Sequence, residues 1–308
     1  YAFRNCISLK SIYVPKTLKN VDTYGWNWHY PFDGCSGITS ITFAEDLTDI
    51  PANLFGNCIC ESVELVIPEG VVSIGDRAFT GCSNIKSISF PSTLTSIGTY
   101  SFKGTGVSKI ELPDNITRIG TSSFSDSSNL VSVKWNNTIS DIPDGTFTNC
   151  VQLESFAFPE VITKVGKEAF SGCSALKDIK WNATIKQLGN EAFMNCDALK
   201  EILLPDSIES IGDGAFRDCE TLTTIKIPNS EMTLGSNVFY NCDSLAAITI
   251  PDSVTSIGSS IFYDCDALTD VTLGTGITSI PSSAFEHCDV LQSIVLPYRT
   301  ATVGANAF

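Results

Sequence analysis

Cysteine is the residue type whose number and spacing most readily suggest chemistry in this sequence. Of the 12 cysteines, only Cys60 lies outside one regular series. The series comprises Cys6, Cys35, Cys58, Cys82, Cys150, Cys173, Cys196, Cys219, Cys242, Cys265 and Cys288. A metal site needs ligands that converge on a point, whereas residues that recur once per repeat form a row with parallel Cβ directions, which also disfavours disulfides. We therefore expect buried, reduced thiols that fill small apolar spaces, with Cys60 as the most reactive.

An aromatic cluster lies in the longest interval between repeats. The segment from Tyr24 to Tyr30 holds Trp26, Trp28 and His29, which are two of the four tryptophans and one of the two histidines. Aromatic side chains in a loop on a rigid scaffold often anchor partners, so Trp26, Trp28 and Tyr30 are candidate ligand-binding residues. The alternative, which we favour, is that this loop packs over the apolar end of the early repeats.

No arrangement of residues for catalysis or metal binding is recognisable in the sequence. His29 and His287 lie in separate repeats, without a nucleophile and a carboxylate in a triad pattern. Asp114, Asp206 and Asp252 each follow a proline, which is typical of turns, and no calcium-loop spacing occurs. We predict no catalytic residues, no metal, no cofactor and no enzymatic activity.

Phenylalanine sets the register of the whole chain. Fourteen of the 18 Phe residues form one series, and its last eight intervals are all 23 residues long. The series comprises Phe3, Phe32, Phe55, Phe79, Phe102, Phe124, Phe147, Phe170, Phe193, Phe216, Phe239, Phe262, Phe285 and Phe308. The consensus of one repeat is Leu-x-x-Ile-x-Ile-Pro-x-x-Leu-x-x-Ile-Gly-x-x-Ala-Phe-x-x-Cys-x-x.

Each part of this repeat has a physical interpretation. Ile202 and Leu204 alternate with outward residues, which predicts a strand with one buried face, and Pro205 ends its pairing. The position of Gly212 is filled by Pro in other repeats, so we expect glycine there for close approach of the backbone and not for a positive φ. Alanine before the anchor Phe216 predicts a single helical or 3₁₀ turn.

A 23-residue repeat cannot bury its apolar face alone, so consecutive repeats must stack. Residues 1–308 then form a single solenoid of about 13 units, with strands of successive units in one parallel sheet. Phe3 and Phe308 both lie within a unit. We therefore expect both ends to be mid-repeat and the chain to be a fragment of a longer protein.

Lysines recur at outward positions of the predicted strands. Lys134, Lys180 and Lys226 follow one another at intervals of 46 residues, among small outward residues such as Ser155 and Ala247. A basic row of this kind could bind an acidic ligand. The alternative, which we favour, is that these lysines keep the sheet soluble and prevent pairing with other sheets.

Composition excludes several classes of function. Hydrophobic residues make up 43% and charged residues 17%, which is incompatible with a disordered chain. The net charge of −15, from 19 basic and 34 acidic residues, disfavours nucleic acid as a partner. No apolar run reaches the length of a membrane span, so we expect no membrane insertion of this segment.

The repeat resembles the leucine-rich repeats of the BspA-like class. The strand segment from Leu222 to Ile227, the proline after the strand and the Ile-Gly-x-x-Ala-Phe-x-x-Cys segment from Ile211 to Cys219 carry the resemblance. It implies an α/β repeat solenoid, a right-handed superhelix with one parallel sheet on the concave face and short helical or 3₁₀ turns on the other side. Departures are Ala44, Asn136, Asn182 and Gly274 at the strand-ending proline, Thr105 and Ser127 at the cysteine, and Glu231 at an apolar position.

The resemblance also implies a function and a location. Members of this class are typically secreted or cell-surface proteins, so we expect a non-enzymatic module of an adhesin that binds host or microbial surface macromolecules. The partner would be a protein or another surface macromolecule. Two alternatives remain: an intracellular protein-interaction scaffold, which free thiols permit, and a glycan-binding module that uses Trp26 and Trp28.

Overall fold

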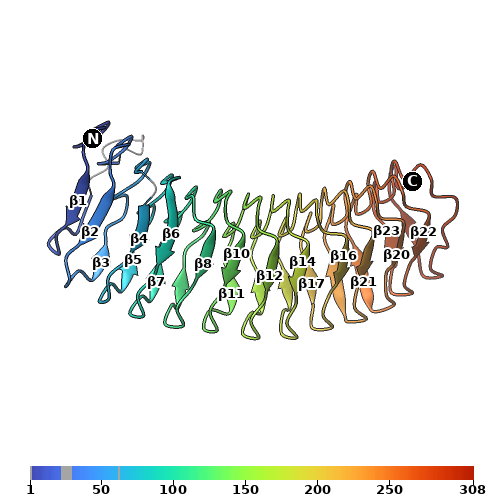
Figure 1. Cartoon of the computed structure of the whole chain (residues 1–308). Helices are drawn as coiled ribbons and strands as arrows, with labels where there is room; N and C mark the ends of the chain where they lie inside the picture. The colour runs from blue at the N-terminus through green and yellow to red at the C-terminus, as the bar shows by residue number, and fades with distance from the viewer. Residues whose placement is uncertain (1, 22–29, 62) are drawn as a thin grey trace. The chain divides into compact units, whose positions relative to one another are not determined.

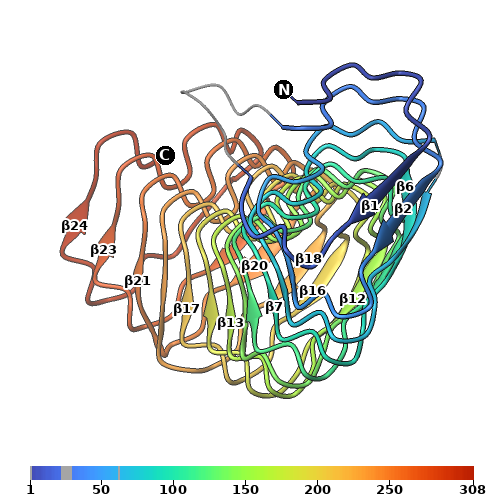
Figure 2. The same ribbon diagram turned by 90° about the vertical axis from the view of Figure 1, so that its left-hand side faces the viewer.

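The fold consists of parallel strands that recur once per coil of the chain and fall into two rows (Figures 1 and 2). The computed structural model describes residues 2–21, 30–61 and 63–308. The chain divides into two compact units. Unit 1 comprises Tyr1–Ile139 and Gly145–Leu153, and unit 2 comprises Ser140–Asp144 and Glu154–Phe308.

The first row contains the strands that precede the proline position of each repeat. In unit 1 these are β1 (Ser11–Val14), β2 (Ser40–Phe43), β4 (Val63–Val66), β6 (Ile85–Ser89), β8 (Lys109–Glu111) and β10 (Ser132–Lys134). In unit 2 they are β12 (Ser155–Ala157), β14 (Asp178–Lys180), β16 (Glu201–Leu203), β18 (Thr224–Lys226), β20 (Ala247–Thr249) and β22 (Asp270–Thr272). These strands pair two at a time, always in parallel.

The second row precedes the glycine position of each repeat, and a second row of strands was not expected. In unit 1 it contains β3 (Asp49–Ile50), β5 (Ser73–Ile74), β7 (Ser96–Ile97) and β9 (Arg118–Ile119), which form one sheet. In unit 2 it contains β11 (Asp141–Ile142), β13 (Lys164–Val165), β15 (Gln187–Leu188), β17 (Ser210–Ile211), β19 (Met232–Leu234), β21 (Val254–Ile257), β23 (Ser279–Ile280) and β24 (Thr302–Val303). The prediction of one parallel sheet is therefore wrong, although the parallel-strand solenoid is confirmed.

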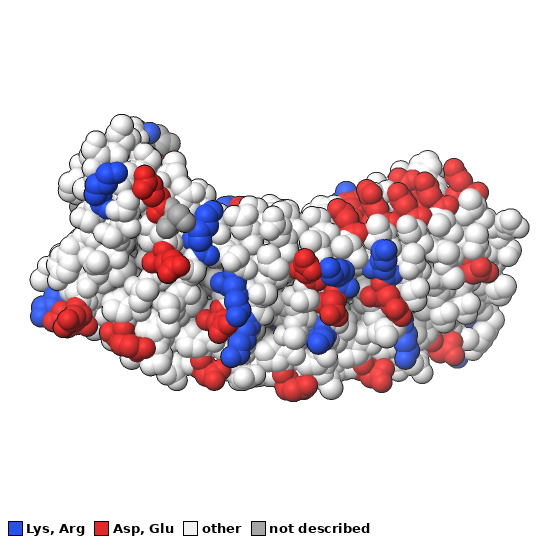
Figure 3. Space-filling view, viewed as in Figure 1, with Lys and Arg blue, Asp and Glu red and all other residues white. Residues whose placement is uncertain are grey.

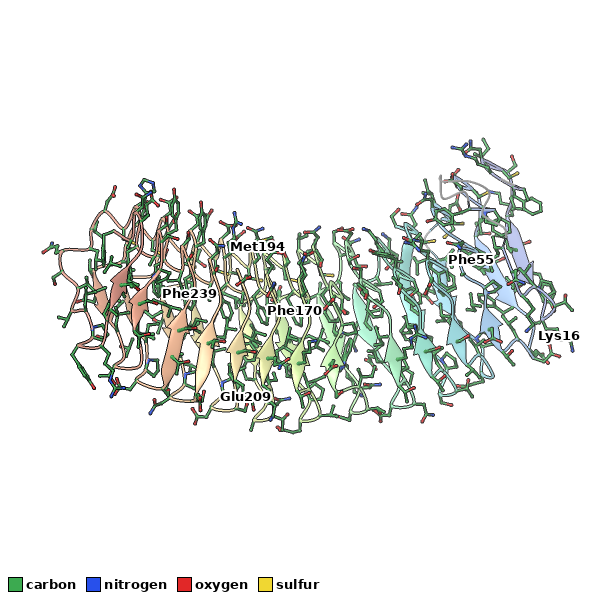
Figure 4. The ribbon with its side chains drawn as sticks, turned by 180° about the vertical axis from the view of Figure 1, so that it is seen from behind. Lys16, Phe55, Phe170, Met194, Glu209 and Phe239 are labelled. Carbon is green, nitrogen blue, oxygen red and sulfur yellow. The ribbon has the colours of Figure 1, made fainter. Side chains whose placement is uncertain are left out.

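Stacked phenylalanine rings form the centre of each unit. In unit 2 the rings of Phe170 and Phe193 are 5.2 Å apart and inclined by 1°, and those of Phe193 and Phe216 are 5.6 Å apart and inclined by 10°. In unit 1 the rings of Phe55 and Phe79 stack at 5.3 Å. Figure 4 labels Phe55, Phe170 and Phe239 within their coils. Each anchor side chain is thus buried against the coils before and after its own.

The segment around each anchor Phe is a succession of turns. The described residues contain no helix, so the prediction of helical or 3₁₀ turns is wrong. Glu191 and Asn195, two residues before and after Phe193, both have φ 56°. Left-handed residues at this spacing prevent a right-handed turn from continuing. They also direct alternate N–H groups to the next coil, so Glu191, Phe193 and Asn195 donate to Asp213, Ala215 and Arg217 at 2.7–3.0 Å.

Where glycine ends a second-row strand, as at Gly212, it permits close packing of the backbone, as predicted. Gly212 does not have a positive φ, and a Cβ placed on it would lie 2.6 Å from the backbone nitrogen of Asn190 in the preceding coil. A real Cβ essentially never approaches backbone so closely. The glycine therefore sets how near two coils can lie.

The cysteine row contributes hydrogen bonds as well as volume. The Sγ of Cys219 donates to the carbonyl of Phe193 at 3.2 Å, and that of Cys242 donates to Phe216 at 3.3 Å. Ser127 makes the same bond to Phe102 at 3.2 Å, which explains why serine can replace cysteine. Burial of the series is confirmed except at Cys6, which is exposed. Burial raises the pKa of the Cys219 thiol to about 12, so its reactive thiolate is suppressed at neutral pH.

Cys60 is fully buried, although its spacing is irregular. A hydrogen bond with Cys58 lowers the pKa of Cys60, and its reactivity stays a prediction. The same bond, followed by burial, raises the pKa of Cys58. The extra residue in this repeat is thus absorbed without placing Cys60 on the surface.

Several departures from the repeat are compensated locally. At the proline position, the Asn136 amide donates to the carbonyls of Pro113 and Ile116 at 3.2 and 2.7 Å. Glu231 is exposed, and Met232 occupies the buried position beside a register shift between β19 and β21.

Buried hydroxyl groups are concentrated in two consecutive coils of unit 1. Ser101 and Ser123 precede the anchor residues Phe102 and Phe124, where most other repeats have alanine. Both side chains are fully buried, and neither Oγ has a hydrogen-bond partner. An unpaired buried hydroxyl costs about 1–3 kcal/mol, so these two serines destabilise unit 1.

Carboxylates gather on the turns that follow the anchor Phe in unit 2 (Figure 3). Burial raises the pKa of Asp243, and the like charges of Asp266, Glu220, Asp264 and Asp218 raise it further. The pKa of Asp197 is raised by burial and by Glu220 and Asp218 in the same way. These acidic turns repel one another at neutral pH.

Replacing Ser123 with alanine is expected to stabilise the protein. The Ser123→Ala variant should increase the free energy of unfolding by about 1 kcal/mol, because it removes a buried hydroxyl without a partner. Ser127→Ala is the matched control and should lower stability by about 1 kcal/mol, because it deletes a hydroxyl that donates to Phe102. Urea denaturation of both variants measures the difference, and a shift of the same sign in both would contradict this explanation.

Neutralising Asp243 should change stability with a defined dependence on pH. A pKa that is raised in the folded state penalises folding once the pH rises through that value. The free energy of unfolding of Asp243→Asn should therefore exceed that of the unchanged chain by roughly 0.2–0.5 kcal/mol at pH 7, and the two should be equal below about pH 3.8. The pKa of Asp252 is lowered by a hydrogen bond from the backbone of Thr275, so Asp252→Asn should show the opposite sign. Thermal denaturation from pH 3 to pH 8 tests both, and equal effects of the two variants would exclude this electrostatic account.

Candidate interaction surface

The outward side of the first-row strands presents a continuous set of accessible side chains in each unit, which we name the strand face. Alternation along the strands produces it: in β16, Ile202 is buried while Glu201 and Leu203 are exposed. The same pattern occurs in β12, β18 and β20. Inward side chains and the bonds between coils hold the fold together, so outward side chains are free to contact a partner.

Small side chains are frequent on the strand face, as predicted. Those predicted outward residues are Ser11, Ser40, Thr42, Ser87, Ser89, Ser132, Ser155, Ala157, Ala247, Thr249 and Thr272. All are exposed except Ser132, which is half-buried. Short side chains allow another molecule to approach the strands closely.

The three candidate lysines all lie on the strand face but have different neighbours. Lys134 in β10 of unit 1 aligns with Glu111, whose pKa is lowered mainly by an ion pair with Lys109 and slightly by Lys134. In unit 2, Lys180 aligns with Ala157 and Lys226 aligns with Leu203. The interval of 46 residues predicts the outward position but not these neighbours. A single binding stripe through all three stays a prediction.

The two lysines of unit 2 are available for a ligand. Within the described ranges of unit 2, neither Lys180 nor Lys226 forms an ion pair, whereas Lys177 pairs with Glu154 at 2.7 Å. Away from the strand face, Lys186 pairs with Glu209 at 2.8 Å. Figure 3 shows basic and acidic side chains interspersed on the surface of this part.

The aromatic candidates are only partly described. Trp26 and Trp28 lie outside the described residues. Tyr30 is 5% exposed, and its ring lies over the backbone of Gly56, where a Cβ would be 2.2 Å from a ring atom. Burial raises the pKa of Tyr30. Tyr30 therefore has the packing role that we favoured and is not a surface anchor.

The strand face also contains a hollow and an exposed apolar residue that the sequence analysis did not single out. In unit 1 a hollow of about 450 Å³ is lined by Ser89, Phe90, Lys109 and Lys134, among others. In unit 2 Leu203 is 55% exposed. Alternation with Ile202 and Leu204 was the signal that could have identified Leu203 as outward.

The remaining candidate residues have structural surroundings. Asp252 accepts the backbone N–H of Thr275 at 2.7 Å, which is the turn role expected of it. The ring of His287 contacts Tyr263 edge-on at 5.1 Å. Across the described ranges, no group of three His, Cys, Asp or Glu side chains could hold a metal ion. A helix long and apolar enough to cross a membrane is likewise absent from these ranges.

Comparison with solved structures finds the same fold in several bacterial proteins. A leucine-rich repeat protein from Bacteroides ovatus is 27% identical with a TM-score of 0.79, and the match covers 97% of this chain and 84% of that one. A protein from Eubacterium ventriosum is 23% identical with a TM-score of 0.61, over 88% and 82% of the two chains. A leucine rich cell surface protein from Faecalibacterium prausnitzii is 23% identical with a TM-score of 0.54, over 96% and 79%.

Comparison with protein families identifies the repeat itself. No curated protein matches the sequence. The family described as "BspA type Leucine rich repeat region (6 copies)" matches residues 1–131, 50–177, 95–219 and 186–308. These matches together span the whole chain. The stacked phenylalanines, the short parallel strands and this match lead to one conclusion: the chain belongs to the BspA type leucine-rich repeat family.

Proposed function

We propose that the chain is a non-enzymatic module of a secreted or cell-surface adhesin, and that its strand face binds host or microbial surface macromolecules. Leucine-rich repeats of this family are in general non-catalytic interaction scaffolds. The similar protein from F. prausnitzii is described as a cell surface protein, which supports the same location here.

The observation that carries this proposal is the strand face of unit 2. Maintaining the fold uses the inward side chains, and Lys167, Lys177 and Lys186 of unit 2 are paired with carboxylates. Lys180 and Lys226 contribute to neither. An exposed cation without an ion-pair partner attracts a macromolecule of complementary charge.

Charge reversal on the strand face tests the proposal. The labelled chain should bind intact bacterial or epithelial cells, and Lys134→Glu, Lys180→Glu and Lys226→Glu together should weaken this binding at least tenfold, because attraction becomes repulsion. The control combines Lys16→Glu, Lys164→Glu and Lys186→Glu, which make the same charge change away from the strand face. Flow cytometry at several concentrations measures the binding.

Two outcomes would contradict the proposal. Equal loss of binding in both triple variants would show that only net charge matters. Absence of saturable binding to any cell surface, together with binding to cytosolic proteins, would favour the intracellular scaffold instead.

A further inference from the structure

Leu203 is an exposed leucine in the middle of a strand. Its side chain is 55% exposed on β16, while the residues on either side, Ile202 and Leu204, are 2% and 4% exposed. Fully burying a leucine side chain is worth about 1.5–3 kcal/mol, and about half of this gain is left unused at Leu203. A single exposed leucine needs no explanation by itself. Its neighbours make this one different.

Two cations occupy the same repeat position as Leu203 in the adjoining coils. Lys226 is its register partner in β18, and Lys180 stands 23 residues earlier at the end of β14. The stacked rings of Phe170, Phe193 and Phe216 show that these three coils follow one another closely, with centroids 5.2 and 5.6 Å apart. Lys180 and Lys226 are therefore separated by about 10 Å, with Leu203 between them.

Hollows adjoin this row on the strand face. One of about 300 Å³ is lined by Lys177, Asp178, Trp181, Lys200, Glu201 and Leu203. The other, of about 400 Å³, is lined by Lys226, Ala247, Thr249, Asp270 and Thr272. Space for a partner's side chains thus exists beside both Leu203 and Lys226.

The charges are arranged in two parallel rows. The carboxylates of Asp178 and Glu201 lie two residues before Lys180 and Leu203 on the same strands, about 7 Å away along the strand. A partner that lies across the strands over Leu203 therefore contacts Lys180 and Lys226, which occupy the same repeat position. A shift by one such step would place its carboxylates beside Asp178 and Glu201, where Lys177 and Lys200 also line the hollow, so the charge there is mixed.

We propose that Lys180, Leu203 and Lys226 form a docking site for an extended acidic peptide segment of a partner protein. An apolar side chain of the segment covers Leu203, and a carboxylate on each side of it binds one lysine. Carboxylates three residues apart in a polyproline II segment are about 9 Å apart, which fits the interval between the lysines. This site rests on the proposed function and specifies the partner that the strand face of unit 2 binds.

Other polyanions fit the site less well. Nucleic acid offers no apolar side chain for Leu203. A peptide supplies both the carboxylates and the apolar group at the required spacing.

A synthetic peptide tests the site directly. The probe is a fluorescein-labelled, capped Pro-Glu-Pro-Leu-Glu-Pro peptide, and fluorescence anisotropy with the full chain at low salt measures its binding. Lys180→Glu with Lys226→Glu should weaken binding at least tenfold, and Leu203→Ser should weaken it at least threefold. Lys164→Glu with Lys186→Glu, on the second-row side of the same unit, should leave it unchanged. All substituted side chains are exposed, and circular dichroism checks that each variant is folded.

The outcomes separate this inference from the proposed function. A lack of saturable binding by the unchanged chain, equal weakening by the control variant, or equal binding of a probe with lysine in place of glutamate would each overturn the docking site. If the peptide fails while the triple strand-face variant still loses cell binding, the docking site is wrong and the adhesin proposal stands. If the peptide binds but no cell surface does, the docking site stands and the adhesin proposal is wrong.

Discussion

A coil of about 23 residues cannot bury its own apolar side chains, and this constraint determines the rest of the molecule. The ring of Phe193 is buried because Phe170 and Phe216 lie against its two faces. Backbone groups obey the same constraint, since the N–H of Phe193 is satisfied by the carbonyl of Ala215 in the next coil. Even the thiol of Cys219 donates to the carbonyl of Phe193 in the preceding coil. Stability therefore resides in the contacts between neighbouring coils.

In this arrangement the outward side chains of the first-row strands are not needed to stabilise the fold. Replacing Leu203 or Lys226 removes nothing that holds β16 or β18 in place, because Ile202 and Ile225 supply the buried contacts. Such positions can change with the partner while the repeat stays constant. Interaction chemistry and folding are thus assigned to alternate residues of the same short strand.

The sequence predicts the features that repeat, because identical physical demands recur in every coil. The period of the phenylalanines, the alternation of Ile202 and Leu204, and the close approach at Gly212 all follow from residue type and spacing. The left-handed residue at Asn195 had a signal in the sequence that spacing alone does not use, because Asn, Asp or Gly precedes ten of the eleven cysteines of the series and these residues favour a positive φ. Glu191 gives no such signal, and its positive φ accompanies the hydrogen bond of its N–H to the next coil.

Irregular positions were the hardest to predict from spacing alone. Cys60 departs from the register, yet its thiol is fully buried. Lys134, Lys180 and Lys226 are equally spaced, but their register partners are Glu111, Ala157 and Leu203. Spacing predicts which way a side chain points, whereas the adjoining strand decides what surrounds it.

Native-state hydrogen exchange of the Phe239→Leu variant tests most directly whether each coil is stabilised only by its contacts with the neighbouring coils. The substitution removes a ring that stacks on Phe216 at 6.0 Å and on Phe262 at 5.5 Å. The amides of Phe216 and Phe262 should lose protection together with that of Phe239, while the amide of Phe170 should keep its protection. Uniform loss of protection throughout unit 2, or loss confined to the coil of Phe239, would contradict the account.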